Sequence, residues 1–286
     1  MQQVLTHPLS RLASDEVQWI WLDTTRFRWE RRLWLTVMAF QAMKEALPIG
    51  DRKLSDVLGA YRYATNAAVN LARIEGRERA TKHDLKARLE EYNYLASRAY
   101  GDKLQLAHLG MTSADVVDNV ALVQMRNSLR HLTTLTSHPG VHDSLIKAIH
   151  HLPFRGIKGP VGTQQDQIDI LGSEEAADEL DGYVARSFDF QDVMNSVGQV
   201  YPRSLDHMVA AAVMSACFIH LQDGWDHKGD QPHNLPMLMI ARGYFRMIGE
   251  YSGDQWGEGD VTTSVIRRVC LPGIFLAADC LLRGVS

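Results

Sequence analysis

The sequence predicts an all-helical protein. Apolar residues recur at the spacing of three and four that marks one face of a helix along most of the 286 residues. Runs with the alternating pattern of a half-buried strand are scarce. Glycine and proline punctuate the periodic segments at a few places, where helices can end and the chain can reverse. These three observations indicate a bundle of long helices.

The helices can be followed in chain order. A long helix begins near Phe27, because Trp34, Leu35, Met38 and Met43 share one face. Residues 54–74 continue the pattern and are expected to form one helix. Residues 209–221 are apolar nearly all round, which is typical of a helix buried inside a bundle. The other expected helices cover residues 83–99, 116–135, 235–248 and 264–282.

Three segments are expected to connect these helices. Residues 137–140 read Ser-His-Pro-Gly, and residues 223–232 combine aspartates, glycines and a proline. Both compositions predict tight turns between helices. Residues 156–164 are punctuated by glycine and are expected to form a short hairpin or an ordered loop.

Composition narrows the class of protein. The net charge of −4 gives no basic excess, so we expect no nucleic-acid partner. The N-terminus shows no signal pattern, and the apolar run 208–221 is shorter than a membrane span, so we expect no membrane association. Cys217, Cys270 and Cys280 are unclustered and lie in or beside apolar runs, as buried thiols do in a reducing compartment. A soluble, cytoplasmic protein is expected.

The most informative stretch is His108 to Asn119. Thr112 and Ser113 follow a glycine and precede an apolar run with helical spacing, which predicts a loop feeding a helix N-terminus. Unpaired backbone N–H groups and the helix dipole favour an anion there, and two hydroxyls add donors for a carboxylate or phosphate. The alternative is a plain helix cap.

A second candidate is the run 81–84, Thr-Lys-His-Asp, which opens a helix. His83 has the side chain best suited to general acid or base work near neutral pH. Lys82 supplies a cation for an anionic substrate, and Asp84 lies in the first helical turn. The alternative is a helix start with incidental charges.

Two further segments could hold anions. Residues 155–164 form a basic, glycine-punctuated loop, although it lacks the Gly-Lys-Ser/Thr ending of a phosphate-binding P-loop. Ser264 and Arg268 are four residues apart and share a helix face, where together they could hold a phosphate. An exposed polar face is the alternative for the second pair.

A metal site is not expected. His138 and His142 have the spacing of helical metal ligands, but Pro139 and Gly140 between them argue against a helix. The acidic, histidine-bearing residues of segment 223–233 could bind a cation, although a solvated turn is the simpler interpretation.

Taken in order, seven blocks resemble the adenylosuccinate lyases of the fumarase and aspartase superfamily. No block is decisive alone, but seven in the family's order along most of the chain are a specific signal. The blocks lie at residues 8–14, 31–34, 81–84, 108–118, 154–164, 199–206 and 255–272.

The resemblance implies a fold, a reaction and an assembly. The fold would be a long-helix bundle (residues 111–286) behind a small helical N-terminal domain (residues 1–110). The reaction would cleave a C–N bond, releasing fumarate from adenylosuccinate or from the succinyl-carboxamide ribotide of purine biosynthesis. It would use general acid–base chemistry with no metal or organic cofactor. Family members form homo-tetramers that build each active site from three subunits.

The resemblance also implies roles for individual residues. Thr112 and Ser113 would hold a succinyl carboxylate, and His83 would support the acid chemistry or the phosphate. Lys82, Asp84, Lys158 and Gln164 would line the substrate site. Arg11, Ser264 and Arg268 would contact the phosphate.

Three parts of the family pattern have no counterpart here. The threonine-histidine block that carries the usual general acid is missing between residues 135 and 153. The Ser-Ser-x-Met-Pro-x-Lys loop that carries the base is missing between residues 221 and 235, and we expect the C-terminal helical domain to be absent as well. Each internal gap has the pattern of a helical hairpin cut back and reclosed. An inactive, lyase-like nucleotide-binding or assembly protein is therefore the alternative to an active lyase.

Overall fold

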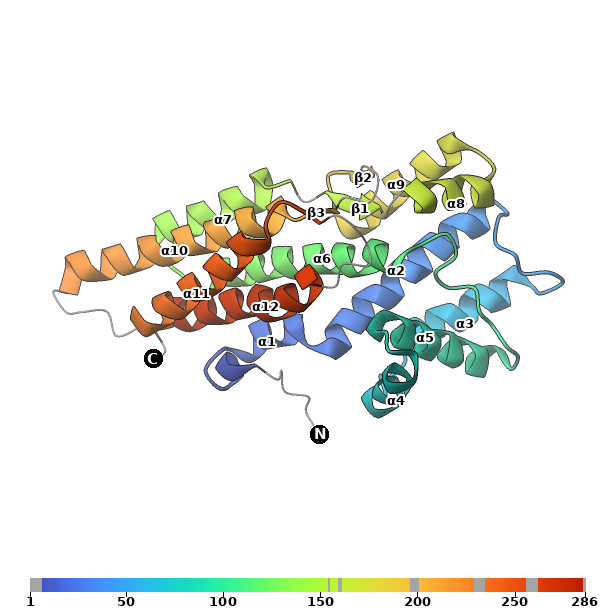
Figure 1. Cartoon of the computed structure of the whole chain (residues 1–286), viewed down its shortest axis with the longest axis horizontal. Coiled ribbons are helices and arrows are strands. Elements are labelled where there is room, and N and C mark those ends of the chain that lie inside the picture. The colour runs from blue at the N-terminus through green and yellow to red at the C-terminus, as the bar shows by residue number, and fades with distance from the viewer. Residues whose placement is uncertain are drawn as a thin grey trace. The chain divides into compact units, whose positions relative to one another are not determined.

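The protein is helical throughout the part that the computed structural model describes, residues 7–153, 155–158, 161–195, 201–228, 235–255 and 262–284. These ranges hold twelve α-helices, one 3-10 helix and four strands of two or three residues. The helices are coloured along the chain in Figure 1. The all-helical prediction is confirmed.

The chain divides into two compact units, each made of separate segments. The first unit combines residues 1–23, 121–154 and 199–286, and the second combines residues 24–120 and 155–198. The division into residues 1–110 and 111–286 expected from the resemblance stays a prediction.

The first unit is a bundle around three long helices. Helix α10 contacts α7, α11 and α12, and α11 contacts α12 (Figure 1). Short β3 and β4 pair antiparallel. The elements of this unit are η1 (Pro8–Arg11), α1 (Asp15–Trp21), the larger part of α6 (Ser113–Thr134), α7 (Pro139–His151), β3 (Tyr201–Pro202), α10 (Ser204–Lys228), α11 (Leu235–Tyr251), β4 (Asp254–Gln255) and α12 (Thr262–Leu282).

Helix α12 forms the centre of that bundle. Every residue from Cys270 to Leu282 is buried, so the C-terminal part of this helix has no solvent face. The indole of Trp21 stacks on the Phe275 ring at 5.8 Å between centroids. A Cβ at position 273 would lie 2.5 Å from the Tyr244 ring, so close packing of α11 against α12 requires glycine there.

Helix α10 is long and apolar enough to cross a membrane by length and composition alone, over Ser204–Gln222. About 44% of that window is buried, and the helix contacts three neighbours of the bundle. The core helix of a soluble protein can meet the same criteria of length and composition, so α10 is weak evidence for a membrane span.

The second unit holds the shorter helices. Helix α5 contacts α3 and α4, and α8 contacts α9. Its core contains Trp34 stacked on Tyr92 at 5.6 Å, with Tyr61 edge-on to Tyr92 at 5.2 Å. The elements are α2 (Asp23–Met43), α3 (Leu54–Asn66), α4 (Leu71–Thr81), α5 (Asp84–Tyr100), the start of α6, β1 (Gly156–Lys158), α8 (Val161–Leu171), α9 (Glu174–Phe188) and β2 (Val193–Asn195).

The single helix predicted for residues 54–74 is wrong, because the chain breaks it into α3 and α4. Ala67 has extended backbone after the last turn of α3. Asn70 then caps α4, its side chain accepting a hydrogen bond from the Arg73 N–H. Asparagine competes for backbone hydrogen bonds in this way and starts a new helix where the apolar stripe alone runs on.

Other connections also differ from prediction. His138 caps α7 and Pro139 is its first residue, so residues 137–140 are a helix start, where proline is well tolerated. Helix α10 continues to Lys228, so the first half of the turn predicted at 223–232 is helical. The remainder lies outside the described residues. Gly156–Lys158 pairs in parallel with Val193–Asn195 and α8 starts at Val161, so this segment is no hairpin.

The three cysteines are buried and free, as predicted. Burial raises the pKa of Cys217 to about 12, and that of Cys270 to about 11. Both thiols therefore stay protonated near neutral pH and are poor nucleophiles.

Candidate active site

The imidazole of His83 stands at the start of α5 in the second unit. Lys82 ends α4 in the left-handed conformation, which turns the chain so that His83 can cap the next helix. The His83 Nδ1 atom accepts a hydrogen bond from the Lys86 N–H at 3.3 Å. The side chain is 46% exposed, so the capping histidine remains accessible from solvent.

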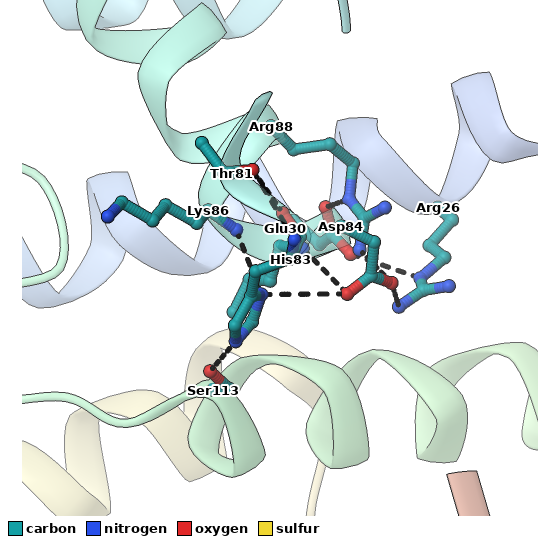
Figure 2. A network of polar contacts seen from close by, with 9 residues as sticks. Arg26, Glu30, Thr81, His83, Asp84, Lys86, Arg88 and Ser113 are labelled. Carbon is teal, nitrogen blue, oxygen red and sulfur yellow. Dashed lines mark hydrogen bonds and ion pairs between the residues drawn. The ribbon is translucent and has the colours of Figure 1, made fainter. Parts of the chain in front are cut away.

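The other ring nitrogen of His83 faces the start of α6. Nε2 lies 3.2 Å from the Ser113 hydroxyl oxygen (Figure 2). Because Nδ1 accepts from Lys86, the proton of a neutral ring sits on Nε2 and can be donated toward Ser113. The structure therefore brings together the two segments that the sequence singled out, at the N-termini of two helices.

The loop before α6, residues 108–113 (the hydroxyl loop), has the predicted form. Ser113 is the first residue of α6, and the Asp115 carboxylate accepts from the Thr112 N–H at 2.6 Å. The Thr112 hydroxyl oxygen is buried and has no hydrogen-bond partner among the described residues. This hydroxyl does not cap the helix, so the cap comes from Asp115 and the threonine keeps unused hydrogen-bonding capacity.

Four charged side chains form a network of ion pairs next to His83, at the start of α5. Glu30 accepts from Arg88 Nε at 2.6 Å and from Arg26 Nε at 3.1 Å. Asp84 lies 3.2 Å from Arg88 Nη2 and 3.5 Å from Arg26 Nη2 (Figure 2). These ion pairs join α2 to the start of α5. Asp84 is part of this network, and its contact with substrate stays a prediction.

His108 is a residue whose importance the sequence did not reveal. Its φ of +77° is unusual for a residue other than glycine. Its Nδ1 accepts from the Trp34 indole N–H at 3.0 Å. Burial lowers the pKa of His108 to about 4, and nearby His83 lowers it as well. A neutral imidazole with its proton on Nε2 therefore lies close to His83, and the glycine two residues later was the only sequence signal for this turn.

Gln164 lies on a helix that contacts the hydroxyl loop. Gln164 is in α8, three residues before Gln167, whose amide contacts the Leu109 and Gly110 carbonyls. Residues three apart share a helix face, so Gln164 belongs to the face that meets the loop. Its Oε1 is buried with no partner among the described residues. Lys158 is in β1, but its side chain lies outside the described part.

The predicted phosphate contacts belong to the first unit. Ser264 and Arg268 both lie in α12, so the expected helical spacing is present. Arg267 beside them points inward and binds Asp206 with two contacts, at 2.6 and 3.2 Å. Arg268 is exposed, as is Arg11 at the end of η1. These residues are described within the first unit alone, and their role stays a prediction.

Two cavities of the second unit are separate from His83. The first, about 40 Å³, lies behind the hydroxyl loop beside Gly110, Met111 and Asp115. Ligand pockets usually measure about 300–1,000 Å³, so it is too small for a nucleotide. The second, about 550 Å³, is lined by Arg77, Tyr94 and other residues of α4, α5 and residues 101–105. No predicted site residue lines it.

No metal centre is found in the described part of the chain, where no three His, Cys, Asp or Glu side chains gather closely enough to hold an ion. His138 is engaged as the cap of α7, with Nδ1 accepting from the Val141 N–H at 3.2 Å. The described residues thus add nothing in favour of the metal site considered at His138 and His142.

Sequence comparison relates the chain to enzymes of one kind. It is 24% identical to adenylosuccinate lyase of Schistosoma mansoni, covering 88% of this chain and 65% of that enzyme. It is 23% identical to adenylosuccinate lyase of Saccharomyces cerevisiae, covering 97% of this chain and 71% of that enzyme. The chain is similar in sequence to adenylosuccinate lyases. No family model matches it.

The length of these alignments shows that this chain is shorter internally than the enzymes it matches. The alignment with the yeast enzyme runs over 349 positions, although the chain has only 286 residues. The yeast enzyme therefore carries internal segments with no counterpart here. Adenylosuccinate lyase of Schizosaccharomyces pombe is 26% identical, with 69% of this chain and 48% of that enzyme covered.

Solved structures share the fold of this chain. β-Carboxy-cis,cis-muconate cycloisomerase of Acinetobacter calcoaceticus matches with a TM-score of 0.71 at 14% identity, covering 96% of this chain and 75% of that one. A fumarate lyase of a Mesorhizobium species matches with a TM-score of 0.64 at 12% identity, covering 99% and 75%. The predicted fumarase and aspartase type of helical bundle is thereby confirmed.

Proposed function

We propose that the chain is a C–N lyase of the adenylosuccinate lyase type, which releases fumarate from adenylosuccinate or from the succinyl-carboxamide ribotide. The observation that carries the proposal is the 3.2 Å contact between His83 Nε2 and the Ser113 hydroxyl. It places a proton donor beside two hydroxyls and the N-terminus of α6, a combination that suits a carboxylate.

An elimination of this kind requires hydrogen-bond donors near the substrate carboxylate. Removing a proton beside a carboxylate creates a carbanion whose extra charge spreads into that carboxylate. Fixed donors aimed at this charge lower the barrier. Thr112 and Ser113 would bind the carboxylate, and His83 would protonate the departing nitrogen or hold the phosphate. Thr112 suits this role because its buried oxygen has no partner among the described residues.

The other residues would bind the rest of the substrate. Gln164 would contact it beside the hydroxyl loop, since its buried oxygen has no partner among the residues that the structure describes. Lys82, Asp84 and Lys158 would complete that side. The phosphate would bind at Arg11, Ser264 and Arg268. Neither a metal nor an organic cofactor is needed for this elimination.

Turnover tests the proposal. Purified protein is mixed with adenylosuccinate, and formation of AMP and fumarate is followed by ultraviolet absorbance. We expect turnover in the wild type and a loss of at least about 100-fold in His83→Ala, since general acid–base groups contribute about 10²–10⁴. His142→Ala is the control, because His142 is a similarly exposed histidine of α7 with a 48% exposed side chain. Equal loss in the two variants contradicts the role of His83.

The second candidate is an inactive nucleotide-binding or assembly protein. Two observations favour it. His138 is occupied as a helix cap in the interval where the family's general acid should lie. Helix α10 extends to Lys228 in the interval of the base-bearing loop, and residues 221–235 contain no Ser-Ser-x-Met-Pro-x-Lys pattern. Absence of turnover together with tight AMP binding would identify this function.

AMP binding also tests the phosphate contacts. Arg268→Ala should weaken binding by about 1.5–3 kcal/mol, the value of a hydrogen bond to a charged group. Arg242→Ala in α11 is the control, because Arg242 is another exposed arginine of the first unit. Equal affinity in wild type and Arg268→Ala, measured by calorimetry, would place Arg268 outside the site.

We further propose a soluble, cytoplasmic homo-oligomer, with no membrane or nucleic-acid partner. Leu235, Met239 and Met247 recur along α11 with side chains 39%, 66% and 40% exposed. Val265 and Val269 of α12 are 59% and 45% exposed. Such apolar stripes favour contact with a second copy. Light scattering after size exclusion should show an oligomer that Met239→Glu weakens.

A further inference from the structure

Two buried glutamines from different helices hold the backbone of the hydroxyl loop. Gln167 Nε2 donates to the Leu109 carbonyl at 3.1 Å and to the Gly110 carbonyl at 2.5 Å. Gln41 Nε2 donates to the same Leu109 carbonyl at 3.1 Å and to Gln167 Oε1 at 3.3 Å. Gln41 is 0% exposed and Gln167 is 2% exposed, so both amides are shielded from solvent at their own end of these bonds.

The orientation of both amides follows from their partners. A carbonyl oxygen can only accept, so each glutamine must turn its NH₂ group toward the loop. Gly110 has a φ of +64°, and a Cβ there would lie 2.6 Å from Gln167 Nε2. The amide thus rests directly against the glycine. Losing these donors would remove the glutamine hydrogen bonds to two part-buried carbonyls.

The groups proposed to bind substrate are carried by this same loop. His108 precedes the two held carbonyls, and Thr112 and Ser113 follow them. At the far end, Asp115 accepts from the Thr112 N–H at 2.6 Å. The loop is therefore fixed at both ends by buried polar groups, and the glutamines hold the end that Asp115 does not reach.

We propose that Gln41 and Gln167 are positioning residues, which act through the Leu109–Gly110 backbone to aim the Thr112 and Ser113 hydroxyls at a substrate carboxylate. This inference rests on the proposed function of the loop. It differs from a merely structural role, because it assigns the pair an effect on carboxylate binding beyond any effect on stability.

Gln167→Met tests the inference, since methionine keeps the length of the side chain and removes both donors. Fumarate and AMP binding are measured by calorimetry on the full chain well below its unfolding temperature. We expect fumarate affinity to fall at least about tenfold, as for loss of a charge-assisted hydrogen bond. AMP affinity should stay within about twofold, because no charge-assisted bond to the phosphate is removed. Gln41→Leu should act in the same direction and more weakly.

Gln165→Met is the matched control. Gln165 is the exposed neighbour of this site on α8, and its amide donates to Asp169 at 2.7 Å. It should bind both ligands as the wild type does. Unchanged fumarate affinity in folded Gln167→Met, or an equal loss for fumarate and AMP, overturns the positioning role. If Gln167→Met does not fold, Gln41→Leu decides by the same criteria. Failure of the wild type to bind fumarate overturns the proposed function as well.

Discussion

Glu30→Gln should destabilise the protein through the charge network behind His83. The Glu30 side chain is 0% exposed and that of its partner Arg88 is 8% exposed, so the pair is buried. Removing one member of a buried ion pair costs about 3–5 kcal/mol, because the remaining charge is left uncompensated. Asp84 still faces Arg88 at 3.2 Å, and glutamine retains one acceptor oxygen. We therefore expect the lower end, about 3 kcal/mol.

Urea denaturation followed by circular dichroism measures this loss, with the midpoint and slope fitted for each variant. Glu90→Gln is the control in the same unit, because the Glu90 side chain is 40% exposed and lies 3.7 Å from Arg77. Exposed pairs of this kind contribute about 0–1 kcal/mol. A loss in Glu30→Gln no larger than that in Glu90→Gln would refute the reasoning.

Two other substitutions test the structure in separate places. Burial raises the pKa of Asp279, but bonds from His131 and Ser14 outweigh this, so its pKa is lowered overall. The resulting stability is present above the unfolded value of about 3.9 and is lost below it. The difference in unfolding free energy between wild type and Asp279→Asn should therefore become smaller from pH 6 toward about pH 3. A difference that stays constant with pH in urea titrations contradicts this. Gly110→Ala should lower thermal stability more than Gly50→Ala, because both have positive φ but only Gly110 lies against a side chain; an equal loss would contradict the tight contact with Gln167.

The elements that periodicity predicts well are those with one strong apolar face. The start of α6 was predictable because Gly110 and the run from Val116 mark a loop and a helix. The break between α3 and α4 was not, because Ala68 and Leu71 continue the stripe and only the Asn70 side chain interrupts it. Strand β1 was missed because three residues show no period and its partner lies far along the chain.

In the candidate site, too, some residues could be predicted from local sequence and some contacts could not. His83, Thr112 and Ser113 could be singled out locally, since each stands at a helix start. The contact of His83 with Ser113 and the two glutamines behind Gly110 join segments distant in sequence. Such contacts depend on tertiary packing, which no local pattern encodes. His108 opened the stretch that the sequence singled out, but no role was predicted for it, because its left-handed backbone is visible only in three dimensions.

The most direct test of the central claim is a crystal structure of the protein with fumarate and AMP bound. Our account predicts a fumarate carboxylate within hydrogen-bond distance of the Thr112 and Ser113 hydroxyls, next to the His83 ring. Fumarate bound elsewhere on the protein, with this place left to solvent, would contradict it.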